Sequence, residues 1–253
     1  MISVRFIERT IRGIGYHRWH HLVLATITIG FVLVGLFLLT SQNFNSLANL
    51  QFNQRLSDLN LSNEQAIVIT NRVAAAHALL DANYQLWFLA AAGIFFLFNL
   101  GLAISAAYRR AAESRSYLLL GKSPTKVALQ YATESMFTFT AVFIGVSLVL
   151  LIISGGITAW WNQLNQGLFQ NSAGGRALLR QFNTQFSRIF DHQLTGFSDQ
   201  SLLFAAAPVS DSLLVYPKPF LLVFLTGIGL ILLSHLLAAG FIRAFAKRDS
   251  LAH

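Results

Sequence analysis

The chain has 253 residues, of which 55% are apolar and only 11% are charged, and its formal net charge is +8 at pH 7. A soluble domain carries about 25% charged residues, so this composition argues against a water-soluble globule and indicates a polytopic membrane protein. The chain contains no Cys, which excludes disulfides, thiolate-bound metals and a thiol nucleophile.

Four apolar runs without charged residues are long enough to cross a membrane. They cover residues 22–40, 86–107, 136–157 and 220–242. A helix of about 20 residues spans the roughly 30 Å hydrocarbon core of a bilayer. The sequence therefore predicts an all-α integral membrane protein with four transmembrane helices.

The segment before the first run, residues 1–21, predicts an amphipathic helix at the cytoplasmic membrane surface. Its apolar and basic residues recur at helical spacing: Val4, Ile7, Ile11 and Ile14 on one side, Arg5, Arg9 and Arg12 on the other. His17 and His21 have the i, i+4 spacing of two metal ligands, but no third ligand is evident near them. We therefore interpret both as interfacial histidines and expect no metal site.

Residues 41–85 predict a small helical stalk or hairpin outside the membrane. This segment contains neither Gly nor Pro, and residues 62–65 read Ser-Asn-Glu-Gln, which is a capping-box pattern. The helix that starts there has an apolar stripe and is expected to run directly into the second span.

The link between the second and third spans, residues 108–135, predicts a helix–turn–helix elbow under the membrane. The apolar run Leu118–Leu120 ends at Gly121, which is typical of a helix C-terminus with positive φ. Ser123 and Pro124 then predict the N-cap and the first residue of a new helix. A basic, partly apolar elbow of this kind suits a docking surface.

The second outer segment, residues 158–219, is longer than the first. Trp160 and Trp161 predict the membrane interface after the third span, and a break is expected at residues 173–175. An amphipathic helix is predicted next, from the apolar repeat Leu178, Phe182, Phe186 and Phe190. Residues 243–253 form a short basic tail.

The chain lacks recognisable enzyme motifs. Gly121, Lys122 and Ser123 resemble the end of a phosphate-binding loop, but Ser116 stands where the first Gly of that loop belongs. Within the spans, Asn99 and His235 are candidates for a translocation or gating role. Interhelical hydrogen bonding is the alternative interpretation of both.

The basic residues predict the orientation of the chain. Twelve of the 18 Lys and Arg residues lie in the N-terminal segment, the 108–135 link and the C-terminal tail, and the net charge of these parts is +8. The outer segments are neutral overall. The positive-inside rule therefore places both termini in the cytoplasm. Because the charges lie beside the spans, anionic lipid headgroups are the expected partner rather than nucleic acid.

The order of residues in the link resembles that of FtsX/MacB-type ABC transporter permeases. In that family the second span is followed by a basic pair, a Glu, a Leu-rich helix, a Leu-Gly-x-Ser turn, another basic residue and a Glu that enters the third span. The corresponding residues are Arg109, Arg110, Glu113, Leu118–Leu120, Gly121, Lys122, Ser123, Lys126 and Glu134. The N-terminal segment and the tail at residues 243–249 are similar as well.

The resemblance implies a permease subunit in a bacterial plasma membrane. It implies two partners, a cytoplasmic ABC ATPase dimer and a second, identical or different, permease chain. The residues that would couple to that ATPase are Arg109, Arg110, Glu113, Tyr117, Leu120, Gly121, Lys122, Ser123, Lys126 and Glu134. ATP and Mg would bind in the ATPase, so this chain is expected to have no cofactor and no catalytic residue. The implied activity is export or extraction of a peptide or amphipathic substrate, including antimicrobial peptides.

Two other interpretations compete with a transporter. A mechanotransmitter would transport nothing and would relay ATPase motion to an extracellular partner such as a cell-wall hydrolase. A structural four-span membrane protein would need no ATPase at all, and its elbow would tolerate substitution. The family usually has a large domain between its first two spans, whereas here the segment between the third and fourth spans is the longer one.

Overall fold

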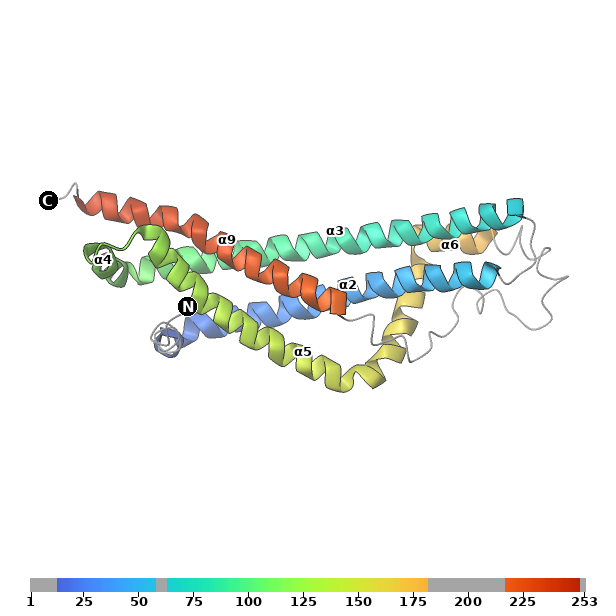
Figure 1. The fold of residues 1–253 in the computed structure, drawn as a ribbon, viewed down its shortest axis with the longest axis horizontal. Helices are drawn as coiled ribbons and strands as arrows, with labels where there is room; N and C mark the ends of the chain where they lie inside the picture. The colour runs from blue at the N-terminus through green and yellow to red at the C-terminus, as the bar shows by residue number, and fades with distance from the viewer. Residues whose placement is uncertain (1–12, 58–62, 182–216, 251–253) are drawn as a thin grey trace. The chain divides into compact units, whose positions relative to one another are not determined.

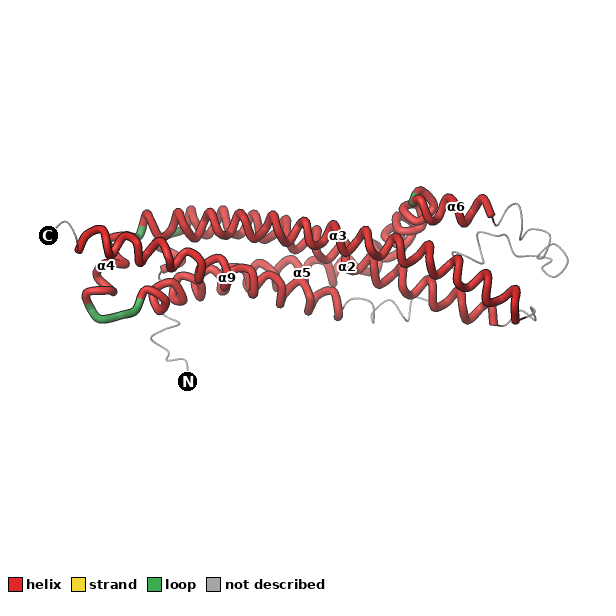
Figure 2. Tube along the Cα trace, turned by 90° about the horizontal axis from the view of Figure 1, so that it is seen from above, coloured by secondary structure: helices red, strands yellow, loops and turns green. Residues whose placement is uncertain are grey.

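The computed structural model describes residues 13–57, 63–181 and 217–250, apart from the side chains of residues 63–66, 154–159, 181 and 241–250. Within these residues the structure consists of helices joined by short turns, and it contains no strand (Figure 2). Four helical stretches are long and apolar enough to cross a membrane: Arg18–Ser57, Ile67–Arg109, Pro124–Ile153 and Pro217–Gly240. The prediction of an all-α chain with four candidate membrane helices is therefore confirmed at this level.

The helices extend beyond the apolar runs (Figure 1). Their bounds are α2 Arg18–Ser57, α3 Asn63–Arg109, α4 Ala111–Leu119, α5 Pro124–Asn171, α6 Ala173–Gln181 and α9 Pro217–Ser250. Helices α2, α3 and α5 have 40, 47 and 48 residues, about twice the length that a bilayer requires.

The N-terminal boundary differs from the sequence-based prediction. Residues 18–21 were expected to end a separate surface helix, but they form the first turn of α2. The polypeptide continues as one helix because nothing between residues 18 and 21 breaks it: no Gly or Pro occurs there. The amphipathic helix predicted for residues 1–21 lies largely outside the described residues.

The chain divides into two compact units. Unit 1 comprises Met1–Gly35, Leu89–Leu150 and Phe220–His253, and unit 2 comprises Leu36–Phe88 and Leu151–Pro219. Helices α2, α3 and α5 contribute residues to both. Each unit is described separately below.

Packed phenylalanine rings connect the helices of unit 1. Phe31 of α2 lies 4.2 Å from Phe95 of α3, Phe95 lies 6.0 Å from Phe139 of α5, and Phe139 lies 6.1 Å from Phe224 of α9, measured between ring centroids. Gly227 gives Phe139 its space, because a Cβ at this position would overlap the Phe139 ring. This contact explains one of the glycines in an otherwise apolar membrane helix.

Unit 2 combines an apolar core with polar contacts between helices. Its core residues include Phe52 and Leu56 of α2 and Ile69 and Val73 of α3. The polar contacts run from Trp161 Nε1 to Ser41 Oγ, from His77 Nδ1 to Asn45 Oδ1, and from Tyr84 Oη to Asn165 Oδ1, at 2.9, 2.6 and 2.9 Å.

The helix break in unit 2 lies one residue before the predicted one. Helix α5 ends at Asn171, and Ser172 caps α6 by accepting a hydrogen bond from the Gly175 N–H at 2.9 Å. Residues 173–175, predicted as the break, instead form the first turn of α6. Leu178 is buried in the unit 2 core, whereas the rest of the predicted stripe, Phe182, Phe186 and Phe190, lies outside the described residues.

Candidate coupling site

The elbow in unit 1 consists of α4, a tight turn and the start of α5 (Figure 1). Gly121 has φ of +77°, as its position after the apolar run predicted. Its N–H donates to the Leu118 carbonyl at 3.0 Å, and the Lys122 N–H donates to the Tyr117 carbonyl at 3.1 Å. These two hydrogen bonds form a Schellman motif, so the end of α4 is closed by a defined turn.

The second half of the turn is capped as predicted. Ser123 Oγ accepts a hydrogen bond from the Lys126 N–H at 3.3 Å, and Pro124 is the first residue of α5. The green loop beside α4 in Figure 2 therefore has a hydrogen-bonded helix end on each side. A turn capped at both ends holds its two helices in one relative orientation.

One side of the elbow packs on unit 1. Tyr117 and Leu118 of α4 contact a buried cluster that contains Val127 and Tyr131 of α5 and Ala239 of α9. The elbow is therefore anchored by apolar contacts to the helices that enter the candidate spans.

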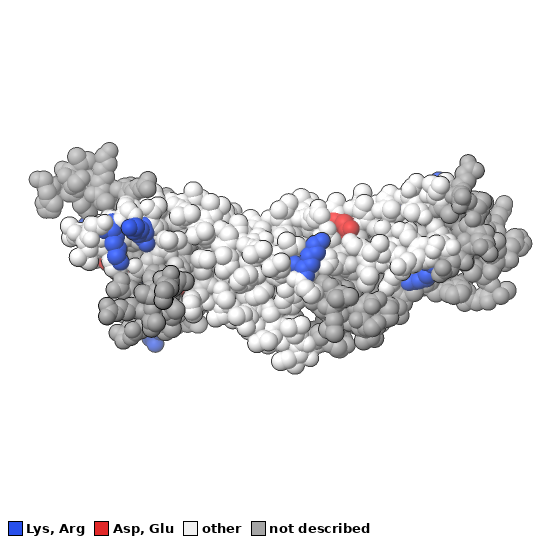
Figure 3. Space-filling model, in the orientation of Figure 1, with Lys and Arg blue, Asp and Glu red and all other residues white. Residues whose placement is uncertain are grey.

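The other side of the elbow is exposed and mixes apolar with basic residues. Leu119 and Leu120 are 89% and 77% exposed, although leucine is usually buried in soluble parts of proteins. The exposed basic residues of this region are Arg115 of α4, Lys126 of α5 and Arg109, the last residue of α3. We refer to Leu119, Leu120, Arg109, Arg115 and Lys126 as the elbow surface. Charged side chains are sparse on the face of the molecule drawn in Figure 3.

Lys122 differs from the other basic residues of the elbow. Its Nζ lies 4.3 Å from the centre of the Tyr117 ring, within the range of a cation–π interaction. Tyr117 in turn donates its hydroxyl to Glu113 Oε1 at 3.3 Å. These contacts stabilise α4 and its turn from within the elbow.

Two residues expected to contact an ATPase are buried instead. Arg110 and Glu134 are 5% and 3% exposed, and Arg110 Nη1 lies 2.6 Å from Glu134 Oε2. The Arg110 guanidinium also lies 4.7 Å from the centre of the Tyr131 ring, and the Tyr131 hydroxyl is 3.0 Å from Ser114 Oγ. In this chain the two charges face each other inside unit 1, and their part in ATPase coupling stays a prediction.

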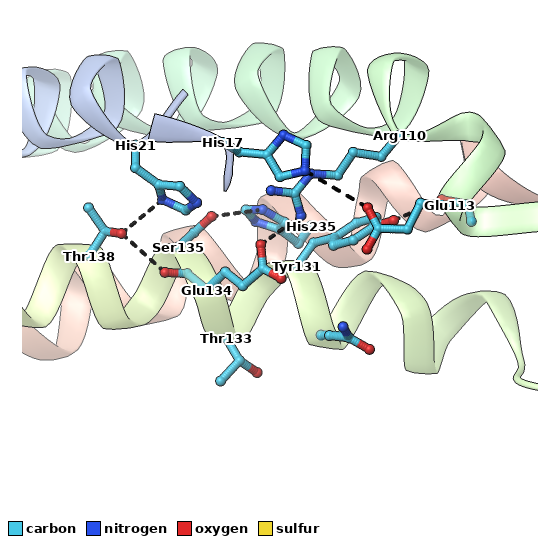
Figure 4. Close-up of polar contacts among 12 residues, drawn as sticks. His17, His21, Arg110, Glu113, Tyr131, Thr133, Glu134, Ser135, Thr138 and His235 are labelled. Carbon is cyan, nitrogen blue, oxygen red and sulfur yellow. Dashed lines mark hydrogen bonds and ion pairs between the residues drawn. The ribbon is translucent and has the colours of Figure 1, made fainter. Parts of the chain in front are cut away.

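Three histidines surround this ion pair (Figure 4). His21 Nδ1 lies 2.9 Å from Thr138 Oγ1, and Thr138 in turn donates to the Glu134 carbonyl at 3.2 Å. His235 donates from Nδ1 to the Ile231 carbonyl at 2.9 Å, so its Nε2 accepts from Ser135 Oγ at 3.2 Å.

His17, just before α2, makes the third histidine contact. Its Nε2 lies 3.9 Å from Glu113 Oε2. Glu113 favours the protonated ring, but partial burial and the nearby Arg110 outweigh it and lower the pKa of His17 below its ordinary value. The contact is therefore made mainly by a neutral imidazole near neutral pH.

The two intramembrane candidates have different surroundings. His235 makes the interhelical contact with Ser135 on α5, which agrees with the alternative interpretation of hydrogen bonding between helices. Asn99 is buried, and its Nδ2 donates to the Phe95 carbonyl of its own helix at 2.8 Å. Its Oδ1 has no hydrogen-bond partner among the described residues.

A polar stripe on α5 was not recognised in the sequence. Tyr131, Glu134, Ser135 and Thr138 are separated by three, one and three residues, so they share one face of α5. The sequence does carry a signal for this stripe, because polar residues at helical spacing begin an otherwise apolar helix. Among the described residues, no group of three or more His, Asp or Glu side chains is placed to hold a metal ion.

Comparison with known proteins gives no relative: no family model, curated protein or solved structure matches this chain.

Proposed function

We propose that this chain is the permease subunit of an ABC transporter, which couples ATP hydrolysis by a separate cytoplasmic ATPase to export or extraction of a peptide or amphipathic substrate. The observation that carries the proposal is the elbow surface: two exposed leucines at the end of α4, beside a turn with a helix cap on each side, and three exposed basic residues of the same region. The resemblance of the link to FtsX/MacB-type permeases supports the same assignment.

The composition of the elbow surface suits a protein partner with an apolar groove and an acidic rim. Burying one exposed leucine stabilises a complex by about 1.5–3 kcal/mol, so Leu119 and Leu120 together offer about 3–6 kcal/mol before the entropic costs of association. Arg109, Arg115 and Lys126 would add electrostatic complementarity, which mainly raises the association rate and the specificity.

The remaining features of the proposal follow from the resemblance and the charge distribution. The chain would lie in the plasma membrane of a bacterium with both termini in the cytoplasm, paired with a second permease chain. ATP and Mg would bind only in the ATPase dimer. The substrate class, including antimicrobial peptides, rests on the resemblance alone.

Mechanical relay without transport is the second candidate. The observation that favours it is the length of α2 and α3, which continue as unbroken helices far beyond the length of a span. A continuous helix transmits displacement along its axis, as a relay to an extracellular partner such as a cell-wall hydrolase requires.

Co-purification tests the proposed function. The full chain is tagged, solubilised in mild detergent, and assayed for a bound ABC ATPase by mass spectrometry and by vanadate-sensitive ATP hydrolysis. We expect Leu119→Asp with Leu120→Asp to abolish both signals. Leu50→Asp is the matched control, because Leu50 is also exposed but belongs to unit 2. If the double variant retained the ATPase, or if the wild-type chain bound none, the proposal would be wrong.

A further inference from the structure

The Arg110–Glu134 ion pair closes the elbow. Arg110 directly precedes α4, and Glu134 lies in the third turn of α5. Everything between them, namely α4, the Schellman turn and the start of α5, therefore forms a loop held at its base by a buried ion pair. Because both charges are shielded from water, separating them leaves an unpaired buried charge, which is strongly unfavourable.

The segment before α2 covers this pair. A Cβ built on Gly13 would lie 2.8 Å from Glu134 Oε1 and 3.1 Å from Glu134 Cδ, so the backbone at Gly13 rests directly on the carboxylate. A free glutamate side chain would move aside. Glu134 is held by Arg110 at 2.6 Å, and a side chain at position 13 would have to displace it from its partner.

Two further contacts connect this segment and the first turn of α2 to the elbow and α5. His17 approaches Glu113 of α4, and His21 contacts Thr138 of α5. Gly13, His17 and His21 are spaced four residues apart, so one side of the chain entering α2 meets α4 and α5 three times. Gly15, two residues from Gly13, has no atom within 4 Å of its built Cβ and provides an internal control.

We propose that Arg110 and Glu134 are positioning residues whose ion pair, covered by the N-terminal segment at Gly13, sets the orientation of the elbow surface. The contact couples residues 13–17 to the elbow: they shield the ion pair from water, and a change at Gly13 that displaces Glu134 from Arg110 loosens the elbow. The consequence for ATPase docking rests on the proposed function, whereas the coupling between the N-terminal segment and the elbow does not.

A double-mutant cycle tests the coupling without any ATPase. Hydrogen–deuterium exchange of residues 111–123 is measured on the full chain in detergent for Gly13→Ala, Gly15→Ala, Glu134→Ala and Gly13→Ala combined with Glu134→Ala. We expect Gly13→Ala to accelerate exchange roughly tenfold, within the range of coupling between contacting residues, and Gly15→Ala to leave it unchanged. In the Glu134→Ala background, where the carboxylate is missing, Gly13→Ala should add nothing.

The exchanged pair Arg110→Glu with Glu134→Arg provides a second test if Glu134→Ala fails to fold. Restoring opposite charges should slow elbow exchange relative to Arg110→Glu alone, which a purely steric role of these positions does not predict. Three results would each overturn the inference. The first is that the effects of Gly13→Ala and Glu134→Ala on exchange add together, and the second is that Gly13→Ala and Gly15→Ala have equal effects. The third is that the exchanged pair does not slow exchange relative to Arg110→Glu alone.

ATPase recovery is measured on the same variants as a separate readout. Loss of the ATPase from Glu134→Ala, in which the elbow surface is intact, supports the positioning role. If the wild-type chain binds no ATPase, the proposed function fails, and the exchange cycle still decides whether the N-terminal segment controls the elbow.

Discussion

Gly121 allows the sharpest single-residue test of the elbow. Its φ is +77°, and a Cβ built on it meets no atom within 4 Å, so any cost of a substitution comes from backbone conformation and not from crowding. A residue other than glycine in this region costs roughly 1–2 kcal/mol, most for a β-branched side chain, whereas Asn often occupies it. We therefore expect Gly121→Val to destabilise the elbow and Gly121→Asn to have little effect.

The magnitude follows from the two ways in which the chain responds to Gly121→Val. If the turn keeps its shape, the elbow bears the strain of roughly 1–2 kcal/mol. If the turn relaxes, it loses the Schellman hydrogen bonds of Gly121 and Lys122, each of which contributes about 0.5–1.5 kcal/mol. Both responses cost about the same, and 1–2 kcal/mol corresponds to a 5- to 30-fold change in an equilibrium constant.

Hydrogen–deuterium exchange measures this change locally. Exchange of residues 111–123 should rise about 5- to 30-fold in Gly121→Val, while residues 28–38 of α2 keep wild-type protection because lipid or detergent burial stabilises them. ATPase recovery should fall in parallel. Equal exchange in the Val and Asn variants would refute the reasoning, because only the Val side chain conflicts with positive φ.

Four further predictions concern separate features. Arg110→Ala should lower stability by about 3–5 kcal/mol because it strands the buried Glu134 charge, whereas exposed Arg109→Ala should cost less than about 0.5 kcal/mol; thermal unfolding in detergent compares them. Gly227→Leu should reduce folded yield by size-exclusion chromatography, because its side chain overlaps a packed phenylalanine. The pKa of His17 is lowered on folding, so the contribution of His17 to stability is present above about pH 6.5 and is lost on acidification. The fall in unfolding temperature between about pH 7 and about pH 5 should therefore be smaller in His17→Gln than in the wild-type chain. Asn171→Cys should react with an impermeant thiol reagent on intact cells, and labelling confined to permeabilised cells would contradict the predicted orientation.

The local features of this protein could be predicted from the sequence because neighbouring residues determine them. Four apolar runs predicted four candidate membrane helices, since only an uninterrupted helix satisfies its backbone hydrogen bonds in hydrocarbon. The elbow turn is also determined by neighbouring residues. Gly121 adopts the positive φ that the turn requires, Ser123 caps α5, and Pro124 is compatible with the first position of α5. None of these assignments required knowledge of a distant residue.

The lengths of the helices were only partly predictable. The absence of Gly and Pro between residues 41 and 57 allowed α2 to continue, but hydropathy alone placed its predicted membrane boundary at residue 40. Polar residues such as Asn45 remain in the helix because they find partners on α3, in this case His77 at 2.6 Å. A hydrogen bond between residues 32 positions apart cannot be predicted from the local sequence pattern.

The roles of the basic residues were decided by tertiary structure. Arg109 and Arg110 are adjacent and chemically identical, and the sequence gives no reason to separate them. In the folded chain Arg109 is exposed, whereas Arg110 turns inward to Glu134, 24 residues away, beneath the backbone at Gly13. Consecutive helical residues point about 100° apart, so only one of the two arginines can face the buried Glu134. The direction in which each points depends on the packing of helices that are distant in the sequence.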